Sequence, residues 1–218
     1  MLLCGCSAKG TEEGKQDKSL DEKANIEKRS INKAGFVDLF KEVKFDTLHI
    51  YFEYSTDGEM AIKGQEVPKE YFSYFPKEVR LGATEWNVSP VFACYRFQYS
   101  PELTALIANV PSEYDATAFD LYLFSDKEDK MIFSQRIAEN TGDAGYVITQ
   151  DSWFLDLDKD GLIDLVTKQI ETIPEDEELT KFSYTDSTSV FLGSEKSFKA
   201  VKPERFNTKR LKVHKSNI

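Results

Sequence analysis

The chain has 218 residues, a formal net charge of −10, a hydrophobic fraction of 40% and an aromatic fraction of 13%. This length and apolar content predict one packed domain with a tail at either end. The acidic charge argues against non-specific nucleic-acid binding, because a phosphate backbone would repel it. The two histidines, His49 and His214, are too few and too far apart in sequence to favour a zinc site.

The N-terminus reads MLLCGC, in which a small residue, Gly5, stands directly before Cys6. The stretch from Leu3 to Cys6 resembles the lipobox of bacterial lipoproteins, where a signal peptide is cleaved before a cysteine that is then acylated. The resemblance implies that residues 1–5 are a remnant of the signal peptide and that Cys6 carries the lipid. It also implies a lipid-anchored place in the bacterial cell envelope, at the outer membrane, facing the periplasm or the cell surface.

Residues 6–34 are predicted to form the lipidated cysteine and a flexible tether. From Ser7 to Ser30 both charge signs are mixed and large apolar residues are almost absent, so burial cannot offset the entropy of folding. A single β-rich domain is expected over residues 35–201.

Two segments at the start of this domain show clear periodicity. Apolar residues at the i, i+3, i+4 and i+7 positions predict a short amphipathic helix over residues 36–43. Residues 45–54 alternate, which predicts a strand with Ile50 on its apolar face. His49 falls on the opposite face, where we expect a half-exposed sheet residue rather than a catalyst.

An aromatic segment lies between Pro68 and Pro76, a spacing that predicts a helical turn. Its aromatic residues are Tyr71, Phe72, Tyr74 and Phe75. Two interpretations are open. The segment is either a lid over the core, which is the commoner arrangement, or a surface patch that binds a ligand.

From residue 91 onward, short polar connections separate apolar segments that predict strands. These segments are 91–99, 103–110, 117–124, 131–137, 146–157, 163–173, 181–184, 189–192 and 197–201. Cys94 lies inside the first of them, where we expect a buried and inert thiol. The succession predicts an antiparallel meander, in a mainly β fold (β-rich α+β) with one or two short helices in its N-terminal half.

The C-terminal residues 202–218 form a predicted basic tail, with six Lys or Arg residues and one acid. Contact with anionic lipid headgroups is one interpretation of this tail. Pairing with the acidic body of the same protein is the other, and we favour it.

The stretch DLDKDGLID, residues 156–164, carries the strongest chemical signal in the chain. Its carboxylates occupy positions 1, 3, 5 and 9 of a tight loop, which are Asp156, Asp158, Asp160 and Asp164. Gly161 at position 6 permits the positive φ that such a turn requires. Calcium prefers six to eight oxygen ligands, so this spacing predicts a calcium site.

The loop and its flanks resemble the calcium loops of FG-GAP and VCBS-type repeats, which read DxDxDGxxD between two strands. The resemblance implies that Leu162 adds its backbone carbonyl to the four aspartates. It covers residues 150–200 once only, and a propeller would need several such repeats. An EF-hand is not favoured, since Thr167 stands at position 12 where a bidentate glutamate belongs. With few protein ligands, calcium affinity should be modest, with Kd of the order of 10⁻⁴–10⁻³ M, and the ion structural.

Motifs of known enzyme classes, such as GxSxG, HExxH and the Walker loop, are absent from the sequence. We therefore expect a binding or interaction module of the envelope, whose ligand is a protein or a glycan. A carboxylate-based envelope hydrolase, for example one directed at glycans, is an alternative, because the chain is rich in acids. A purely structural lipoprotein is a third.

Overall fold

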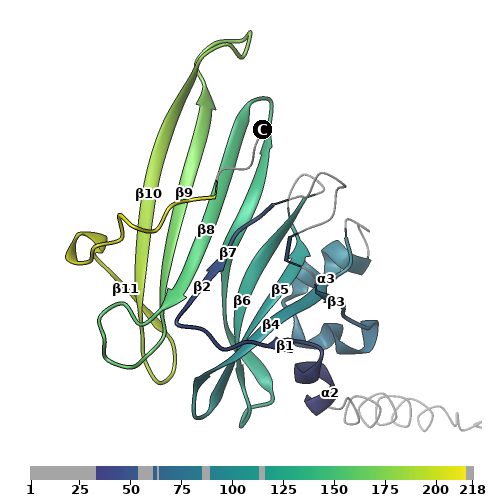
Figure 1. Ribbon diagram of the computed structural model, residues 1–218. Helices are drawn as coiled ribbons and strands as arrows, with labels where there is room; N and C mark the ends of the chain where they lie inside the picture. Colours follow the sequence, from purple (N-terminus) through teal and green to yellow (C-terminus); the bar gives the residue numbers. More distant parts are fainter. Residues whose placement is uncertain (1–32, 54–60, 63, 85–88, 113–115, 215–218) are drawn as a thin grey trace, which may run out of the picture. The chain divides into compact units, whose positions relative to one another are not determined.

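One sheet of eleven strands organises the part of the chain that the structure describes (Figure 1). The computed structural model describes residues 33–53, 61–62, 64–84, 89–112 and 116–214. The strands are β1 (Lys41–Glu42), β2 (Thr47–Ile50), β3 (Gln65–Glu66), β4 (Phe92–Ser100), β5 (Leu103–Pro111), β6 (Thr117–Ser125), β7 (Lys130–Asp143), β8 (Tyr146–Leu155), β9 (Asp164–Pro174), β10 (Phe182–Gly193) and β11 (Phe198–Val201). The helices are α2 (Lys33–Asp38) and α3 (Lys77–Thr84), with 3₁₀ turns η2 (Lys69–Tyr74) and η3 (Pro203–Arg205).

The strands from β4 to β11 are neighbours in the sheet in the order in which they follow one another along the chain. Every pair in this series is antiparallel, and β1 adds a short parallel pairing to β4. The predicted fold class is confirmed: the protein is mainly β, with a meander, and the α-helices of its described residues, α2 and α3, lie in the N-terminal half. The tight turn between β7 and β8 places Ala144 and Gly145 at positive φ, as a two-residue hairpin requires.

The sheet divides along the length of β8. Strands β7 and β8 pair only over Glu139–Asp143 and Tyr146–Gln150. Beyond that point β2 takes the place of β7 and pairs with β8 over Ser152–Leu155. Because β7 departs while β2 closes the gap, the strands on the two sides of the division curl around a common interior.

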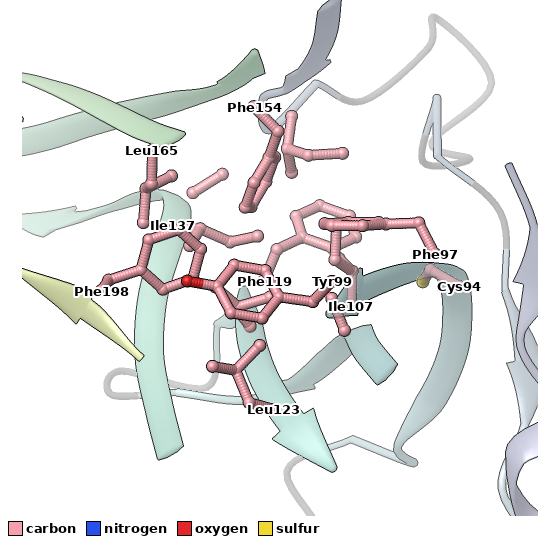
Figure 2. Packing of buried hydrophobic residues seen from close by; sticks show 14 of the residues in the cluster. Cys94, Phe97, Tyr99, Ile107, Phe119, Leu123, Ile137, Phe154, Leu165 and Phe198 are labelled. Carbon is pink, nitrogen blue, oxygen red and sulfur yellow. The ribbon is translucent and has the colours of Figure 1, made fainter. Parts of the chain in front are cut away.

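The inner face of the curled sheet holds the main core (Figure 2). Strand β4 meets β8 through Phe97 and Phe154, whose ring centroids are 5.4 Å apart. It meets β11 through Tyr99 and Phe198, at 4.8 Å. Cys94 is buried beside this core as predicted, and desolvation raises the pKa of its thiol to about 12. Contacts between strands so distant in the sheet order show that the curl is fixed by aromatic packing.

The outer face of β4–β6 is covered by the helical segments α2, η2 and α3 (Figure 1). Phe36 of α2 is fully buried and stacks on Tyr74, with ring centroids 4.4 Å apart. Phe75 packs edge-on against Tyr122 of β6, at 5.5 Å. Each such ring contributes about 1.5–3 kcal/mol through burial, so the N-terminal helices are held mainly by aromatic contacts.

The C-terminal segment lies on the other face of β8–β10 and forms a third apolar cluster with it. Leu211 is buried there against Trp153 and Val190. The backbone carbonyl of Leu211 accepts a hydrogen bond from Nζ of Lys168, at 2.8 Å. Of the predicted basic tail, residues 203–214 therefore contact the sheet largely through apolar side chains, whereas we expected charge pairing.

The predicted helix over residues 36–43 is wrong in its bounds, because α2 ends at Asp38. Arg96 of β4 donates hydrogen bonds to the Val37 carbonyl, at 3.1 Å, and to the Asp38 carboxylate, at 2.6 Å. Lys41–Glu42 then pairs with the edge of β4. The helix therefore ends early, although the apolar residues keep a helical spacing. The salt bridge from Arg96 holds its end, and the chain that follows pairs with the edge of β4.

The two strands predicted over residues 181–184 and 189–192 are one continuous strand, β10. Its middle consists of Thr185, Asp186, Ser187, Thr188 and Ser189, which read as a loop in sequence. Ten successive residue pairs with β9 carry the strand through this polar stretch. The backbone ladder, rather than apolar alternation, defines the strand here.

The strand predicted over residues 45–54 is present but shorter, because β2 covers only Thr47–Ile50 and residue 54 lies outside the described residues. Its two faces are assigned correctly. Ile50 is fully buried in the main core. His49 lies on the other face and stacks on Trp153, with ring centroids 4.4 Å apart and planes within 9°. In the described residues, no helix has the length and apolarity needed to cross a membrane.

Candidate functional site

The acidic loop connects β8 to β9 at the end of the strands where β11 also lies (Figure 1). Leu155 and Asp164, which bound the loop, are paired across the two strands. Lys159 has a φ of 68° and Gly161 a φ of 90°. Two left-handed residues in one connection reverse the chain sharply, as the glycine at position 6 predicted.

The loop is held by its own carboxylates. Oδ2 of Asp156 accepts a hydrogen bond from the Gly161 amide at 3.1 Å. Oδ1 of Asp158 accepts one from the Asp160 amide at 3.2 Å, and Oδ1 of Asp160 accepts one from the Leu162 amide at 2.8 Å. Each aspartate therefore holds a backbone amide two to five residues further along the loop. Together the three hydrogen bonds hold the loop in one conformation.

Asp164 anchors the loop to the body of the protein. Its side chain is 1% exposed. Its Oδ2 accepts a hydrogen bond from the Leu157 amide at 2.7 Å, and its Oδ1 accepts one from the Gly193 amide of β10 at 2.8 Å. Burial raises the pKa of Asp164 above its ordinary value, and the charge of Asp158 adds to this, while the two amides act in the opposite direction.

Three of the predicted ligands come together. One carboxylate oxygen from each of Asp156, Asp158 and Asp164 lies within 4.8 Å of the other two. Asp160 lies outside this group, with one oxygen on the Leu162 amide. Leu162 contacts the loop through its backbone amide, which donates the hydrogen bond to Asp160. The structure thus brings together three carboxylates, where the sequence predicted a site of four carboxylates and a carbonyl.

The chemistry of the trio fits a hard cation. Carboxylate oxygens are the ligands that calcium prefers. Within the described residues, no lysine or arginine forms an ion pair with Asp156, Asp158 or Asp164. Three negative charges at this separation repel one another, and a divalent ion would relieve the repulsion.

The aromatic segment predicted as a lid or a patch serves mainly as a lid. Phe72 and Phe75 are buried in the second core cluster, and Tyr71 and Tyr74 are half-buried at its margin. The hydroxyl of Tyr74 donates a hydrogen bond to the Asp129 carboxylate, at 3.3 Å. The lid interpretation is therefore the better description of this segment, although it leaves part of two tyrosine rings at the surface.

A hollow of about 340 Å³ adjoins this lid. Its lining residues are Tyr74, Phe75, Pro76, Tyr122, Met131, Ile132, Phe133 and Ser134. Ile132 is 39% exposed, which is unusual for a large apolar side chain in this protein. Sequence reasoning did not identify the contribution of β6 and β7, because it requires knowing that these strands pass beneath η2.

Sequence reasoning also missed a cluster that joins both histidines of the chain. Oδ2 of Asp151 accepts a hydrogen bond from the His214 amide at 2.6 Å and lies 2.9 Å from Nε2 of His49. Tyr51 lies between the two imidazoles, with ring centroids 4.8 Å from His49 and 4.4 Å from His214. The cluster ties the C-terminal segment to β2 and β8.

The lipidation site predicted at Cys6 lies outside the described residues. Comparisons with protein-family models, with curated proteins and with solved structures find no match to this chain. Function is therefore inferred from the residues and their arrangement.

Proposed function

We propose that this protein is a lipid-anchored interaction module of the bacterial cell envelope, whose β domain is stabilised by a calcium ion. The lipid would be attached to Cys6, and the ion would be held in the loop of residues 156–164. The partner would be a protein or a glycan, and the calcium would be structural.

The observation that carries the calcium part is the trio of Asp156, Asp158 and Asp164, with oxygens within 4.8 Å of one another. Asp164 is the member that matters most, because its carboxylate is buried without a basic partner among the described residues. A buried charge is costly unless it is paired or bound to a metal. A cation at this position would offset that cost.

The role of the ion follows from what Asp164 touches. Its two oxygens accept hydrogen bonds from the loop, at Leu157, and from β10, at Gly193. Fixing the position of this one carboxylate therefore fixes the loop between β8 and β9 and its contact with β10. Calcium bound here would stiffen the hairpin of β8 and β9 and its contact with β10.

The interaction part is supported by the surface beside the lid. The 340 Å³ hollow is lined mainly by aromatic and aliphatic residues, with the half-buried Tyr74 at its edge. Hollows of this kind suit an apolar group of a ligand, with a few polar groups setting its orientation. No carboxylate is among the described residues that line it, which favours binding over acid–base chemistry at this place.

Calcium titration of the protein tests the proposal, with calorimetry for affinity and with melting curves in calcium or in chelator. At calcium concentrations tenfold to hundredfold above Kd, we expect stabilisation by about 1.4 to about 2.7 kcal/mol, or roughly 3–10 °C in Tm. Asp158→Asn should abolish the effect. Asp186→Asn, which removes an exposed carboxylate from β10 outside the loop, should retain it.

Absence of both heat and a Tm shift at calcium concentrations tenfold above the highest expected Kd would refute the metal site. The anchor is tested separately by expressing the chain behind a complete lipoprotein signal in a bacterial host and measuring the mass of the mature N-terminus. Acylation should be lost in Cys6→Ala and unchanged in Cys94→Ala. An unmodified Cys6 would refute the anchoring.

A further inference from the structure

The long strands β7–β10 continue past the cores to form a four-stranded arm, defined here as residues 140–149 and 170–186 (Figure 1). The rows of paired residues run without interruption along it, from Asn140, Thr149, Ile170 and Asp186 outward. No residue of the arm is buried. Both faces of this part of the sheet are therefore open, although the same strands are covered on both faces lower down.

The arm carries most of the exposed large apolar side chains found among the described residues. Four of the five belong to it: Tyr146 at 39% exposure, Ile173 at 37%, Leu179 at 43% and Tyr184 at 68%. An exposed apolar side chain on a sheet face that no described residue covers is a candidate contact for another molecule. The strand register places Tyr184 on the face that carries Pro174, and it places Tyr146 and Ile173 on the opposite face.

The end of the arm is hollowed between its two turns. A cavity of about 540 Å³ is lined by Ala144 of the first turn and by residues of the loop between β9 and β10. Leu179 forms one wall, at a φ of 55°. The loop is ordered by Asp176, whose carboxylate accepts hydrogen bonds from the Thr180 hydroxyl, at 2.5 Å, and from the Thr180 amide, at 2.7 Å. These bonds lower the pKa of Asp176.

The charge of the arm identifies the class of molecule that would bind. Its sequence contains seven acids and one lysine, a net charge of −6 out of −10 for the whole chain. Four of the acids, residues 175–178, are consecutive in the end loop. Such a surface repels phosphate backbones and anionic lipid headgroups and attracts cationic groups.

We infer that the end of the arm binds a cationic segment of a partner protein, with an apolar side chain of that segment in the cavity between the two turns. Lysine or arginine residues of the partner would face the acidic loop. Tyr184, which lies on the same face of the sheet as Pro174 of the cavity lining, would extend the apolar contact along the sheet. This inference rests on the proposed role as an interaction module and adds the partner's chemistry. It does not depend on calcium, since the acidic loop at residues 156–164 lies at the opposite end of β8 and β9.

A fluorescent peptide of alternating lysine and leucine with a central tryptophan is a suitable probe, and fluorescence anisotropy measures its binding. We expect binding that weakens as salt rises, because charge pairing between exposed groups is screened. A peptide with glutamate for lysine should not bind. A peptide with alanine for tryptophan should bind at least tenfold more weakly.

Matched variants separate the arm from the general charge of the protein. Glu175→Gln with Glu177→Gln should weaken binding at least tenfold, whereas Glu195→Gln with Glu204→Gln, which removes the same charge from exposed sites elsewhere, should not. Tyr184→Ala should weaken it, whereas Tyr184→Phe, which keeps the exposed ring, should not.

Equal losses in the arm variants and their controls would overturn the inference, as would the absence of probe binding. Concentration-dependent dimerisation that the arm variants abolish would also overturn it, because a second copy would then be the occupant. Running the assay in calcium and in chelator distinguishes the proposals. Probe binding without a calcium effect would refute only the metal site, and calcium stabilisation without probe binding would refute only the arm.

Discussion

Replacing Asp151 by alanine should release the C-terminal segment from the sheet. The carboxylate of Asp151 is 1% exposed and accepts a hydrogen bond from the His214 amide at 2.6 Å. It also lies 2.9 Å from Nε2 of His49. A carboxylate can only accept, so Nε2 of His49 carries the hydrogen in this contact. The substitution therefore removes the acceptor that the His49 ring, in β2, and the His214 amide, in the C-terminal segment, share.

The size of the effect follows from those two contacts. A hydrogen bond to a charged group contributes roughly 1.5–3 kcal/mol, and a buried donor left without its acceptor adds a desolvation cost. His49 keeps 28% of its side chain exposed, so water can satisfy its ring after the substitution. The His214 amide would lose the acceptor that it has in the native structure. We therefore expect Asp151→Ala to cost about 3 kcal/mol in the free energy of unfolding.

Two measurements check this prediction. Urea denaturation gives the global loss, and hydrogen exchange gives the local one, which should be concentrated in residues 203–214. Asp186→Ala is the control, because it removes an exposed aspartate from β10 and should change stability by less than about 0.5 kcal/mol. Unchanged hydrogen exchange in residues 203–214 would refute the conclusion that Asp151 holds the C-terminal segment to the sheet.

Three further predictions follow from packing. Gly193→Ala should lower both stability and calcium affinity, because its Cβ would lie 2.4 Å from the Ile163 carbonyl, and calorimetry and urea denaturation measure the two effects. Leu211→Ala should cost about 2–5 kcal/mol by opening a cavity over β8–β10, measured by urea denaturation. Cys94 should resist alkylation in the native protein at pH 8 and react after unfolding, as followed by peptide mass spectrometry. Its raised pKa also means that native stability falls as pH rises from 9.0 towards about 12, and Cys94→Ala should reduce that fall.

The meander could be predicted from sequence because its signals are local. Alternating apolar residues mark β4 to β6, and connections such as Ser100-Pro101-Glu102 mark the turns between them. The curl could not be predicted, since it depends on β2 replacing β7 beside β8 across more than one hundred residues of chain. The same limit explains β10, whose polar middle is a strand only because β9 supplies its ladder.

The acidic loop combines local contacts, which could be predicted from sequence, with one long-range contact, which could not. The carboxylates of Asp156, Asp158 and Asp160 accept hydrogen bonds from amides at most five positions away, so the local sequence that predicted the turn also contains the contacts that hold it. The anchor of Asp164 on the Gly193 amide joins residues 29 positions apart, and nothing in the local pattern identifies it. Asp164 could therefore be predicted from sequence as a candidate ligand, but its burial could not.

The two ends of β8 and β9 differ in how much of their surface is buried and in what holds them. At the end near Asp164 the strands are buried, and their connection is held by a buried carboxylate and would be held further by calcium. At the other end the arm has no buried residue, and its backbone ladder is its main internal support. Segments with little buried apolar surface open most readily. Calcium should therefore protect the amides near Leu157 and Gly193 from hydrogen exchange and leave those of the arm unchanged, while a bound partner should protect the arm.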